Sequence, residues 1–338
     1  MMKSLFYIIL SSVVMCLKAQ DAHFSSDPTR LIYNYPTQTG LINGCYRVDM
    51  NYRNQWFSIG APYGTYLLSI DEPIKLKSNP RLKFAVGAYI MQENSLGGIY
   101  KQTDFKLTLA NHYFLDPDHK HLLSTGIQFG TIQASFNISE IGFENQFNNV
   151  SSFDLSRNNF ESLESNRIGV IDYCLGLAHR FNSEQLQIES GIAVQHLNKP
   201  SFSFNQDSSS NLSRRYNGFI KLNIPTVKKI DIEPLINFSN QNRNILLLAG
   251  LNVTLKEFLK SGDNQQFSLG GFYRLGDAVI LNASLMLKNQ IIRFSYDSNI
   301  STFSKATYSL GALEVSYTLL IKCKPNLPKD FVLPCIRL

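Results

Sequence analysis

The sequence predicts an all-β protein: a transmembrane antiparallel β-barrel of the outer-membrane type, with about 14 strands. Three observations predict this fold. Apolar and polar residues alternate with period two over most of the chain, the alternating segments are long, and very short turns are interspersed with long polar loops. Side chains of a strand point alternately to its two faces, so this alternation indicates strands with one apolar face and one polar face. Such strands, joined by turns and loops of unequal length, are typical of outer-membrane barrels.

The composition is light in charge without being strongly apolar. Of 338 residues, 44% are hydrophobic and 17% are charged, and the mean hydropathy is -0.11. Soluble proteins carry about 25% charged residues, and a helical membrane protein needs stretches of ~20 apolar residues. The composition also excludes a disordered chain, a coiled coil and a collagen-like chain. The formal net charge of +6 is too small and too scattered to indicate a nucleic-acid partner.

The first element in the chain, residues 1–20, has the order of regions of a secretory signal peptide. A short basic start is followed by an apolar run over residues 4–17 and by the small residue Ala19, where a signal peptidase would cut. The apolar run is too short for a membrane-spanning anchor, which needs ~20 residues. A lipoprotein signal with Cys16 is disfavoured because Met15 occupies a place that normally holds a small residue. We therefore expect an exported protein.

Residues 21–44 show no strand pattern, and the alternation begins immediately after them. On the first strand one face carries Arg47, Asp49, Arg53 and Gln55, and the other face is apolar. We expect the charged face to line the barrel interior, and residues 21–44 to lie in the periplasm or against that lining from inside.

The same alternation of apolar and polar residues marks the strands expected over the rest of the chain. The expected strands are 45–56, 64–73, 81–93, 100–114, 120–137, 166–181, 184–198, 212–225, 227–240, 243–260, 265–276, 278–288, 289–298 and 307–322.

A pair of soluble β-sandwiches is the main alternative fold. The expected strands of about 10–16 residues exceed the 5–6 that are usual in soluble sheets. No Pro-, Gly- or Ser-rich linker divides the chain, and aromatic residues such as Tyr113, Tyr273 and Tyr317 stand near strand ends, as in the aromatic girdles of barrels. We therefore expect a single barrel over residues 45–322 and a short periplasmic tail over residues 323–338.

Four cysteines remain after removal of the signal peptide: Cys45, Cys174, Cys323 and Cys335. An exported protein reaches an oxidising compartment, and four cysteines allow three pairings. The spacings contain no paired C-x-x-C units, which makes a zinc site improbable. Because Cys323 and Cys335 lie in the same short tail, they are the favoured disulfide, with free thiols as the alternative.

Several short motifs, in order along the chain, resemble the PorP/SprF family of Bacteroidetes, which are accessory outer-membrane proteins of type IX secretion. The matching stretches are Gln20 to Ser25, Tyr52-Arg53-Asn54-Gln55-Trp56, His196-Leu197-Asn198-Lys199-Pro200, Tyr273 to Ala278, Phe294-Ser295-Tyr296-Asp297 and the ending Pro334-Cys335. Asn34-Tyr35-Pro36 and Gly311-Ala312-Leu313-Glu314 depart from the family's usual residues at the corresponding positions.

The resemblance implies an outer-membrane barrel that helps to secrete, or to hold at the cell surface, a particular type IX substrate, in some members a gliding adhesin. The implied partners are outer-membrane lipid, one type IX-secreted surface protein, and periplasmic or outer-membrane secretion components. Candidate residues for contacting a partner or lining the lumen are Arg47, Asp49, Arg53, Gln55, Trp56 and His196. The alternative for this set is an ordinary polar lumen lining, with Trp56 as an anchor at the membrane interface.

Enzymatic signals are weak. The chain contains no Gly-x-Ser-x-Gly, H-E-x-x-H or phosphate loop. Residues 116–121 gather two carboxylates and two imidazoles, but a solvated turn explains them as well as a metal site does. An outer-membrane hydrolase would need a Ser beside a His, which the sequence cannot bring together. We expect no enzyme, metal or cofactor, and a diffusion porin or specific uptake channel remains the alternative function.

Overall fold

The computed structural model describes residues 21–75, 79, 81–137, 141–148, 152–154, 156–157, 166–204, 210–226, 229–256, 265–302 and 304–323. The expected signal peptide over residues 1–20 and the tail beyond residue 323, including Cys335, lie outside these described residues.

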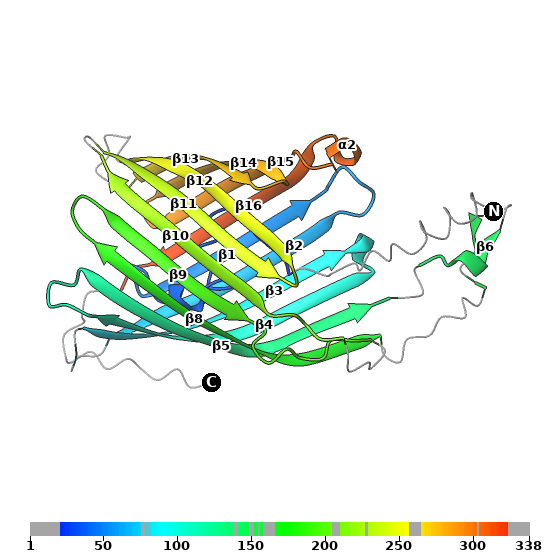
Figure 1. The fold of residues 1–338 in the computed structure, drawn as a ribbon, viewed down its shortest axis with the longest axis horizontal. Helices are drawn as coiled ribbons and strands as arrows, with labels where there is room; N and C mark the ends of the chain where they lie inside the picture. Colours follow the sequence, from blue (N-terminus) through cyan, green and yellow to red (C-terminus); the bar gives the residue numbers. More distant parts are fainter. Residues whose placement is uncertain are drawn as a thin grey trace, which may run out of the picture.

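The described chain forms a closed antiparallel barrel of fourteen strands, which confirms the predicted fold (Figure 1). Neighbouring strands in the chain pair around the barrel, except that β5 pairs with β8 across the long insertion between them. The barrel closes where β1 pairs with β16, from Tyr46 opposite Ile321 to Gln55 opposite Ala312. Each of the fourteen expected segments corresponds to one barrel strand.

The barrel strands are β1 (Tyr46–Gln55), β2 (Tyr63–Lys75), β3 (Leu82–Ser95), β4 (Tyr100–Phe114), β5 (His121–Phe136), β8 (Arg167–Asn182), β9 (Gln187–Gln195), β10 (Arg215–Pro225), β11 (Ile230–Gln241), β12 (Asn244–Lys256), β13 (Gln265–Arg274), β14 (Ala278–Leu287), β15 (Gln290–Asn299) and β16 (Leu310–Ile321). The described elements that are not part of the wall are the small hairpin β6 (Phe147–Asn148) and β7 (Ser152–Phe153), the 3₁₀ turns η1 (Pro36–Gln38), η2 (Leu96–Gly98) and η4 (Glu144–Gln146), and α2 (Ser304–Thr307). No helix among the described residues is long and apolar enough to cross a membrane.

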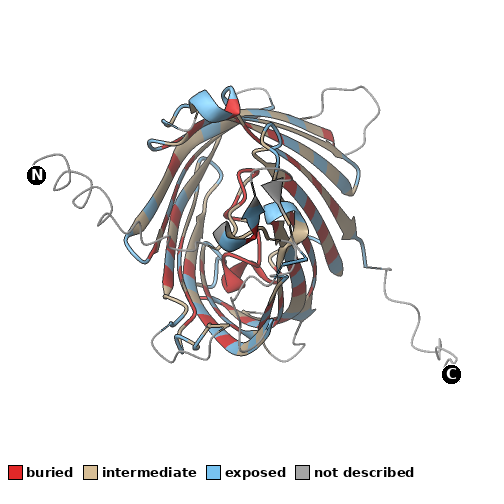
Figure 2. Cartoon of the chain, turned by 90° about the vertical axis from the view of Figure 1, so that its right-hand side faces the viewer, coloured by how far each residue is buried: buried red, intermediate tan, exposed pale blue. Residues whose placement is uncertain are grey.

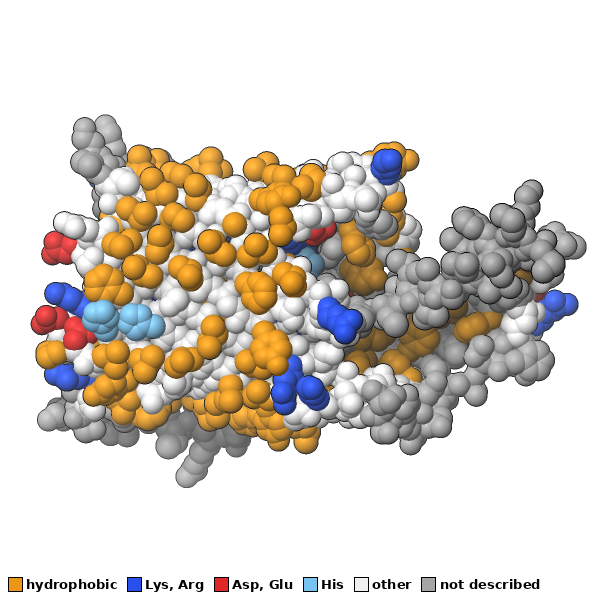
Figure 3. All heavy atoms as spheres, in the orientation of Figure 1, with side chains coloured by type: hydrophobic (Ala, Val, Ile, Leu, Met, Phe, Trp, Pro, Cys, Tyr) orange, Lys and Arg blue, Asp and Glu red, His pale blue; other side chains and the backbone are white. Residues whose placement is uncertain are grey.

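The two faces of the wall differ as the alternation predicts. On β1, Asp49 and Arg53 are buried inside, whereas Met50 between them is 50% exposed on the outside. Apolar side chains cover the outer face of the barrel (Figure 3). So extensive an exposed apolar surface would be unfavourable in water, and it matches the lipid-facing band of an outer-membrane barrel.

The two ends of the barrel differ in the length of their connections. One end, here called the loop end, carries the long connections after β5 and β9 and the segment with α2 (Figure 1). The other end, here called the turn end, carries short connections such as that between β14 and β15, together with Cys45 before β1 and Cys323 after β16. Because long loops of outer-membrane barrels face outward and short turns face the periplasm, we assign the turn end to the periplasm.

Residues 21–44, here called the plug, lie inside the barrel, which is one of the two placements that the sequence allowed. Figure 2 looks into the loop end and shows this buried segment surrounded by the wall. The aromatic ring of Tyr35 packs against Phe219 of β10, and Tyr33 packs against Tyr89 of β3. A Cβ atom on Gly126 would lie 2.6 Å from the carbonyl carbon of Pro36. The wall therefore needs glycine there for η1 to approach so closely.

The predicted Cys323–Cys335 disulfide is wrong. The structure instead joins Cys323 to Cys45, with their Cα atoms 5.0 Å apart, and a sulfur atom forms only one disulfide. Closure of the barrel is the physical reason, because it brings the start of β1 and the end of β16 together at the turn end. Cys174 is a free thiol, buried in the wall.

Candidate functional site in the barrel lumen

The plug is held at the loop end by a chain of opposite charges that runs through His196. Asp21 Oδ2 lies 2.7 Å from His196 Nε2, and Asp172 Oδ2 lies 3.0 Å from His196 Nδ1. Lys106 on β4 donates a hydrogen bond to the same Asp172 oxygen. His196 directly follows β9 and has φ 56°, a left-handed conformation that turns the chain just as the strand ends. Its ring is buried between the two carboxylates.

The charged groups around His196 stabilise one another. Burial by itself would raise the pKa of Asp21, but the neighbouring His196 and Arg215 hold it well below its ordinary value. Burial would lower the pKa of His196, but Asp21 and Asp172 raise it to about 9. Each partner thus favours the charged form of the other, as expected for buried groups of opposite sign.

A second cluster surrounds Ser25, and its members come from four strands. Arg53 of β1 and Arg274 of β13 both contact Asp297 of β15, at 2.9 and 2.7 Å. Glu314 of β16 accepts hydrogen bonds from the backbone N–H groups of Ser25 at 2.7 Å and Ser26 at 3.1 Å.

The hydroxyl of Ser25 lies at the centre of this cluster. It donates a hydrogen bond to Asp297 at 2.8 Å and accepts hydrogen bonds from Arg53 at 2.8 Å and Arg274 at 3.1 Å. Two guanidinium groups and two carboxylates therefore surround one serine of the plug, and Arg274 also contacts the half-exposed Asp277 at 2.6 Å.

A third group of contacts holds the part of the plug nearer the turn end. Arg30 Nη1 lies 2.6 Å from Asp49 Oδ1, and Arg47 lies 2.8 Å from Asp71 of β2. The carbonyl of Gln38 accepts a hydrogen bond from Arg47 at 2.9 Å, and Asp71 accepts another from the backbone N–H of Gly40 at 2.6 Å. The Arg47–Asp71 pair is thus completed by the plug backbone.

These contacts, from Asp21 to Gly40, are called the lumenal network. Most of its charged members are buried, and Asp21 and Arg30 are nearly so. Removing one member of a buried ion pair costs about 3–5 kcal/mol because the other charge is left uncompensated. The plug therefore fits this wall through specific side-chain partners as well as through apolar packing.

Four of the six candidate residues from the sequence belong to the lumenal network: Arg47, Asp49, Arg53 and His196. Gln55 shares the inward-facing parity of these β1 residues but forms no hydrogen bond or ion pair with the described part of the plug. Trp56 lies just past β1 at the loop end, where its ring packs edge to face against Tyr63 at 5.2 Å. The structure thus brings four candidates onto the plug and leaves two at the rim.

Sequence reasoning missed most of the partners of these four residues. The missed residues are Asp21, Arg30, Asp71, Lys106, Asp172, Arg274, Asp297 and Glu314. Four of them, Asp21, Arg274, Asp297 and Glu314, stand inside the quoted family-like motifs. For the three on strands, the alternation that points them inward was the available signal. Nothing in the sequence indicated which acid meets which base.

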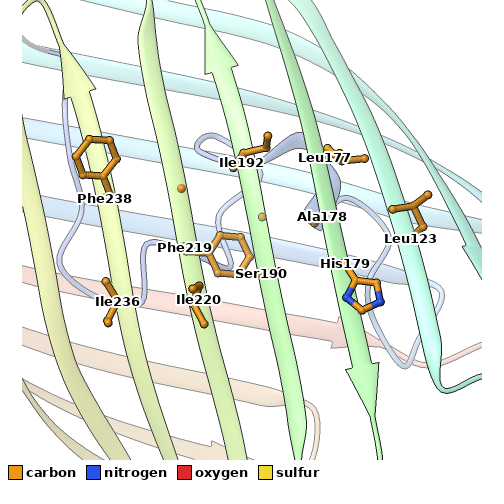
Figure 4. A pocket seen from close by; sticks show the side chains of 12 residues that line it. Leu123, Leu177, Ala178, His179, Ser190, Ile192, Phe219, Ile220, Ile236 and Phe238 are labelled. Atoms are coloured by element: carbon orange, nitrogen blue, oxygen red, sulfur yellow. The ribbon is translucent and has the colours of Figure 1, made fainter.

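No group of three or more His, Cys, Asp or Glu side chains among the described residues is placed to hold a metal ion. A cavity of about 500 Å³ lies on the outer wall over β8 to β11, lined by apolar side chains such as Leu177, Ile192 and Phe238 (Figure 4). These side chains point away from the lumen, so the cavity is a dent in the lipid-facing surface.

Comparisons with known proteins agree with this architecture. Among solved structures, the toluene transporter TbuX of Ralstonia pickettii matches with a TM-score of 0.50 and 10% identity, over 89% of this chain and 96% of that chain. A FadL homologue of Pseudomonas aeruginosa has a TM-score of 0.47 and 10% identity, over 88% and 94%. BamA of Haemophilus ducreyi, without POTRA domains 1–3, has a TM-score of 0.44 and 10% identity, over 82% and 70%. At 10% identity the likeness to TbuX shows the fold alone. No curated protein matches the sequence.

The family comparison is more specific. The model for the type IX secretion system membrane protein PorP/SprF matches residues 17–319, which include the plug and nearly the whole barrel. The family and the outer-membrane type of barrel place the protein in the outer membrane. This match, together with the ordered motifs and the closed barrel, shows that the chain belongs to the PorP/SprF family of type IX secretion system membrane proteins.

Proposed function

We propose that this protein is a non-enzymatic accessory barrel of type IX secretion, which helps to export or surface-anchor one specific secreted protein. Its further partners are periplasmic or outer-membrane components of the secretion system. Membership of the PorP/SprF family supports the secretion role, and the resemblance noted in the sequence makes a gliding adhesin one class of candidate for the secreted protein.

The filled lumen is the structural observation that carries this proposal over the porin alternative. A diffusion porin needs a water-filled channel through the barrel. Here the plug runs from Asp21 at the loop end to Gly40 near the turn end, and buried ion pairs hold it along the way. A lumen filled in this way obstructs the passage of solutes, whereas the loops, the turns and the plug can still bind other proteins.

Deletion of the gene tests the secretion role. Mass spectrometry of the cell surface, the medium and the periplasm should show one protein, or a small set, retained in the periplasm while general type IX secretion continues. Complementation with the wild-type gene should restore export of that protein. Unchanged secretion in the deletion strain would contradict the proposal, and co-purification from native membranes would identify the partner.

Conductance measurements test the porin alternative separately. The purified barrel in a planar bilayer should show no steady open channel while the plug is in place. A steady conductance from the wild-type protein would favour the porin or uptake channel instead.

A further inference from the structure

The plug leaves part of the lumen unfilled near the turn end. A polar cavity of about 190 Å³ lies between Ser26 and Asp27 of the plug and the inner wall of β10 to β15. Its wall includes Gln266, Met286 and Ile291, each within a residue of the turn end of its strand. The cavity, here called the vestibule, therefore lies at the periplasmic side of the barrel.

Arg293 of β15 lines the vestibule and differs from the arginines of the lumenal network. Arg30, Arg47, Arg53 and Arg274 each contact a carboxylate, whereas no carboxylate among the described residues lies within salt-bridge distance of Arg293. Among the described residues, its one hydrogen bond is a donation from Nη1 to the hydroxyl of Thr318 at 2.9 Å. The other N–H groups of this guanidinium remain available to a ligand.

Hydroxyl groups flank Arg293 along one row of the inner wall. Arg293 stands opposite Ser284 of β14, Ser284 stands opposite Ser268 of β13, and Ser268 stands opposite Thr254 of β12. All four residues line the vestibule. The Thr254 and Ser268 hydroxyls hydrogen-bond each other at 2.7 Å, which leaves the Ser284 hydroxyl beside Arg293. A guanidinium with a neighbouring hydroxyl donor is a favourable environment for a planar oxyanion, which the guanidinium binds through two parallel hydrogen bonds.

The remaining charges in the vestibule limit what kind of anion fits. Lys221 contacts both Asp27 at 3.2 Å and Glu233 at 3.6 Å, so these three groups sum to one negative charge. Asp49, which accepts a hydrogen bond from Thr318, is already paired with Arg30. With Arg293 included the lining charges sum to zero, and Arg293 is the one lining cation that no described carboxylate contacts. One such cation matches one anionic group better than several.

From this arrangement we propose that the vestibule is a binding site for a single carboxylate group, held by the Arg293 guanidinium and the Ser284 hydroxyl and entering from the turn end. The carboxylate belongs either to a free small acid or to a peptide, such as a C-terminus presented from the periplasm. The site does not depend on the secretion role, because its ligand is recognised by chemistry present in the barrel alone.

Isothermal titration calorimetry on the purified full-length barrel tests the proposal with four probes. These are sodium acetate, sodium phosphate, a short peptide with uncharged side chains and a free C-terminal carboxylate, and the same peptide amidated. The carboxylate peptide or acetate should bind, and the amidated peptide should bind about tenfold or more weakly, as expected for loss of a charge-assisted hydrogen bond. Binding of acetate without the peptide would assign the site to small acids, and binding of the peptide would assign it to a protein ligand.

Variants locate the binding. Arg293→Gln should weaken carboxylate binding about tenfold or more, and Ser284→Ala should weaken it less. Arg243→Gln is the matched control, because Arg243 is exposed in the turn between β11 and β12 at the opposite end of the barrel. Heat-modifiable migration on gels checks that each variant forms a barrel. No binding of any carboxylate probe, equal binding of the amidated peptide, tighter binding of inorganic phosphate, or full binding by Arg293→Gln would each overturn the proposal.

Discussion

His196 Nε2 lies 2.7 Å from Asp21 Oδ2, and this contact ties the first described residue of the plug to the end of β9, 175 positions later in the chain. It places the start of the plug at the loop end, whereas the plug joins β1 at the turn end. The plug thus runs the length of the lumen between two fixed ends, and its contacts have measurable consequences for stability.

The His196–Asp21 contact predicts a pH dependence. Because the pKa of His196 is raised to about 9 in the folded barrel, its stabilising contribution is complete below its unfolded pKa of about 6.5 and is lost as the pH rises through 9. The low pKa of Asp21 acts in the opposite sense, because its contribution is complete above an unfolded pKa of about 3.9 and declines only in stronger acid. We expect plug retention to be greatest between these limits.

Limited proteolysis of the plug and thermal unfolding, both followed from pH 5 to pH 10, measure this dependence. His196→Asn should remove the loss of stability above neutral pH while lowering stability at pH 6. An unchanged pH profile in His196→Asn would show that another group is responsible.

Removal of the buried charge of Arg53 should lower the stability of the barrel strongly. Arg53→Gln leaves Asp297 with Arg274 alone and leaves Glu314 without its cation. We expect the free energy of unfolding to fall by about 3–5 kcal/mol, measured by urea titration of the barrel in lipid vesicles. Lys120→Gln is the control of equal charge change, because its pair with Asp118 is exposed and such pairs contribute about 0–1 kcal/mol. Equal losses in the two variants would contradict a structural role for the Ser25 cluster.

The strands could be predicted from the sequence because each carries its own two-faced pattern. The pattern also identified Arg47, Asp49 and Arg53 as inward-facing. It could not identify the plug contacts, because residues 21–44 show no alternation of apolar and polar residues. In addition, Ser25 contacts Asp297, which lies near the other end of the sequence. The disulfide shows the same limit. Closeness in sequence suggested Cys323 and Cys335, whereas closure of the barrel makes Cys45 the neighbour of Cys323.

The Cys45–Cys323 disulfide predicts a covalently closed seam between β1 and β16. Cys45→Ser with Cys323→Ser should still form the barrel, because the strands pair along the whole of β1, but should lose about 2–5 kcal/mol of stability. Thermal unfolding with and without reductant measures the loss, and Cys174→Ala is the control that keeps the disulfide. Peptide mapping of the oxidised protein should find Cys45 linked to Cys323 even in a Cys335→Ser variant, and loss of the link in that variant would contradict the structure.

The close approach of the plug to Gly126 predicts that a side chain introduced at this position of the inner wall displaces the plug. A Cβ there would lie 2.6 Å from the carbonyl carbon and 2.8 Å from the carbonyl oxygen of Pro36, which are backbone atoms that cannot rotate away. Gly126→Val should therefore cost roughly 1–3 kcal/mol, as overpacking does, and should push η1 away from β5. Gly271→Val is the matched control, because a Cβ at Gly271 meets nothing within 4 Å. In planar bilayers Gly126→Val should conduct ions more often than the wild type and the Gly271→Val barrel should not, whereas identical conductance of the two variants would mean that the plug does not depend on this close approach.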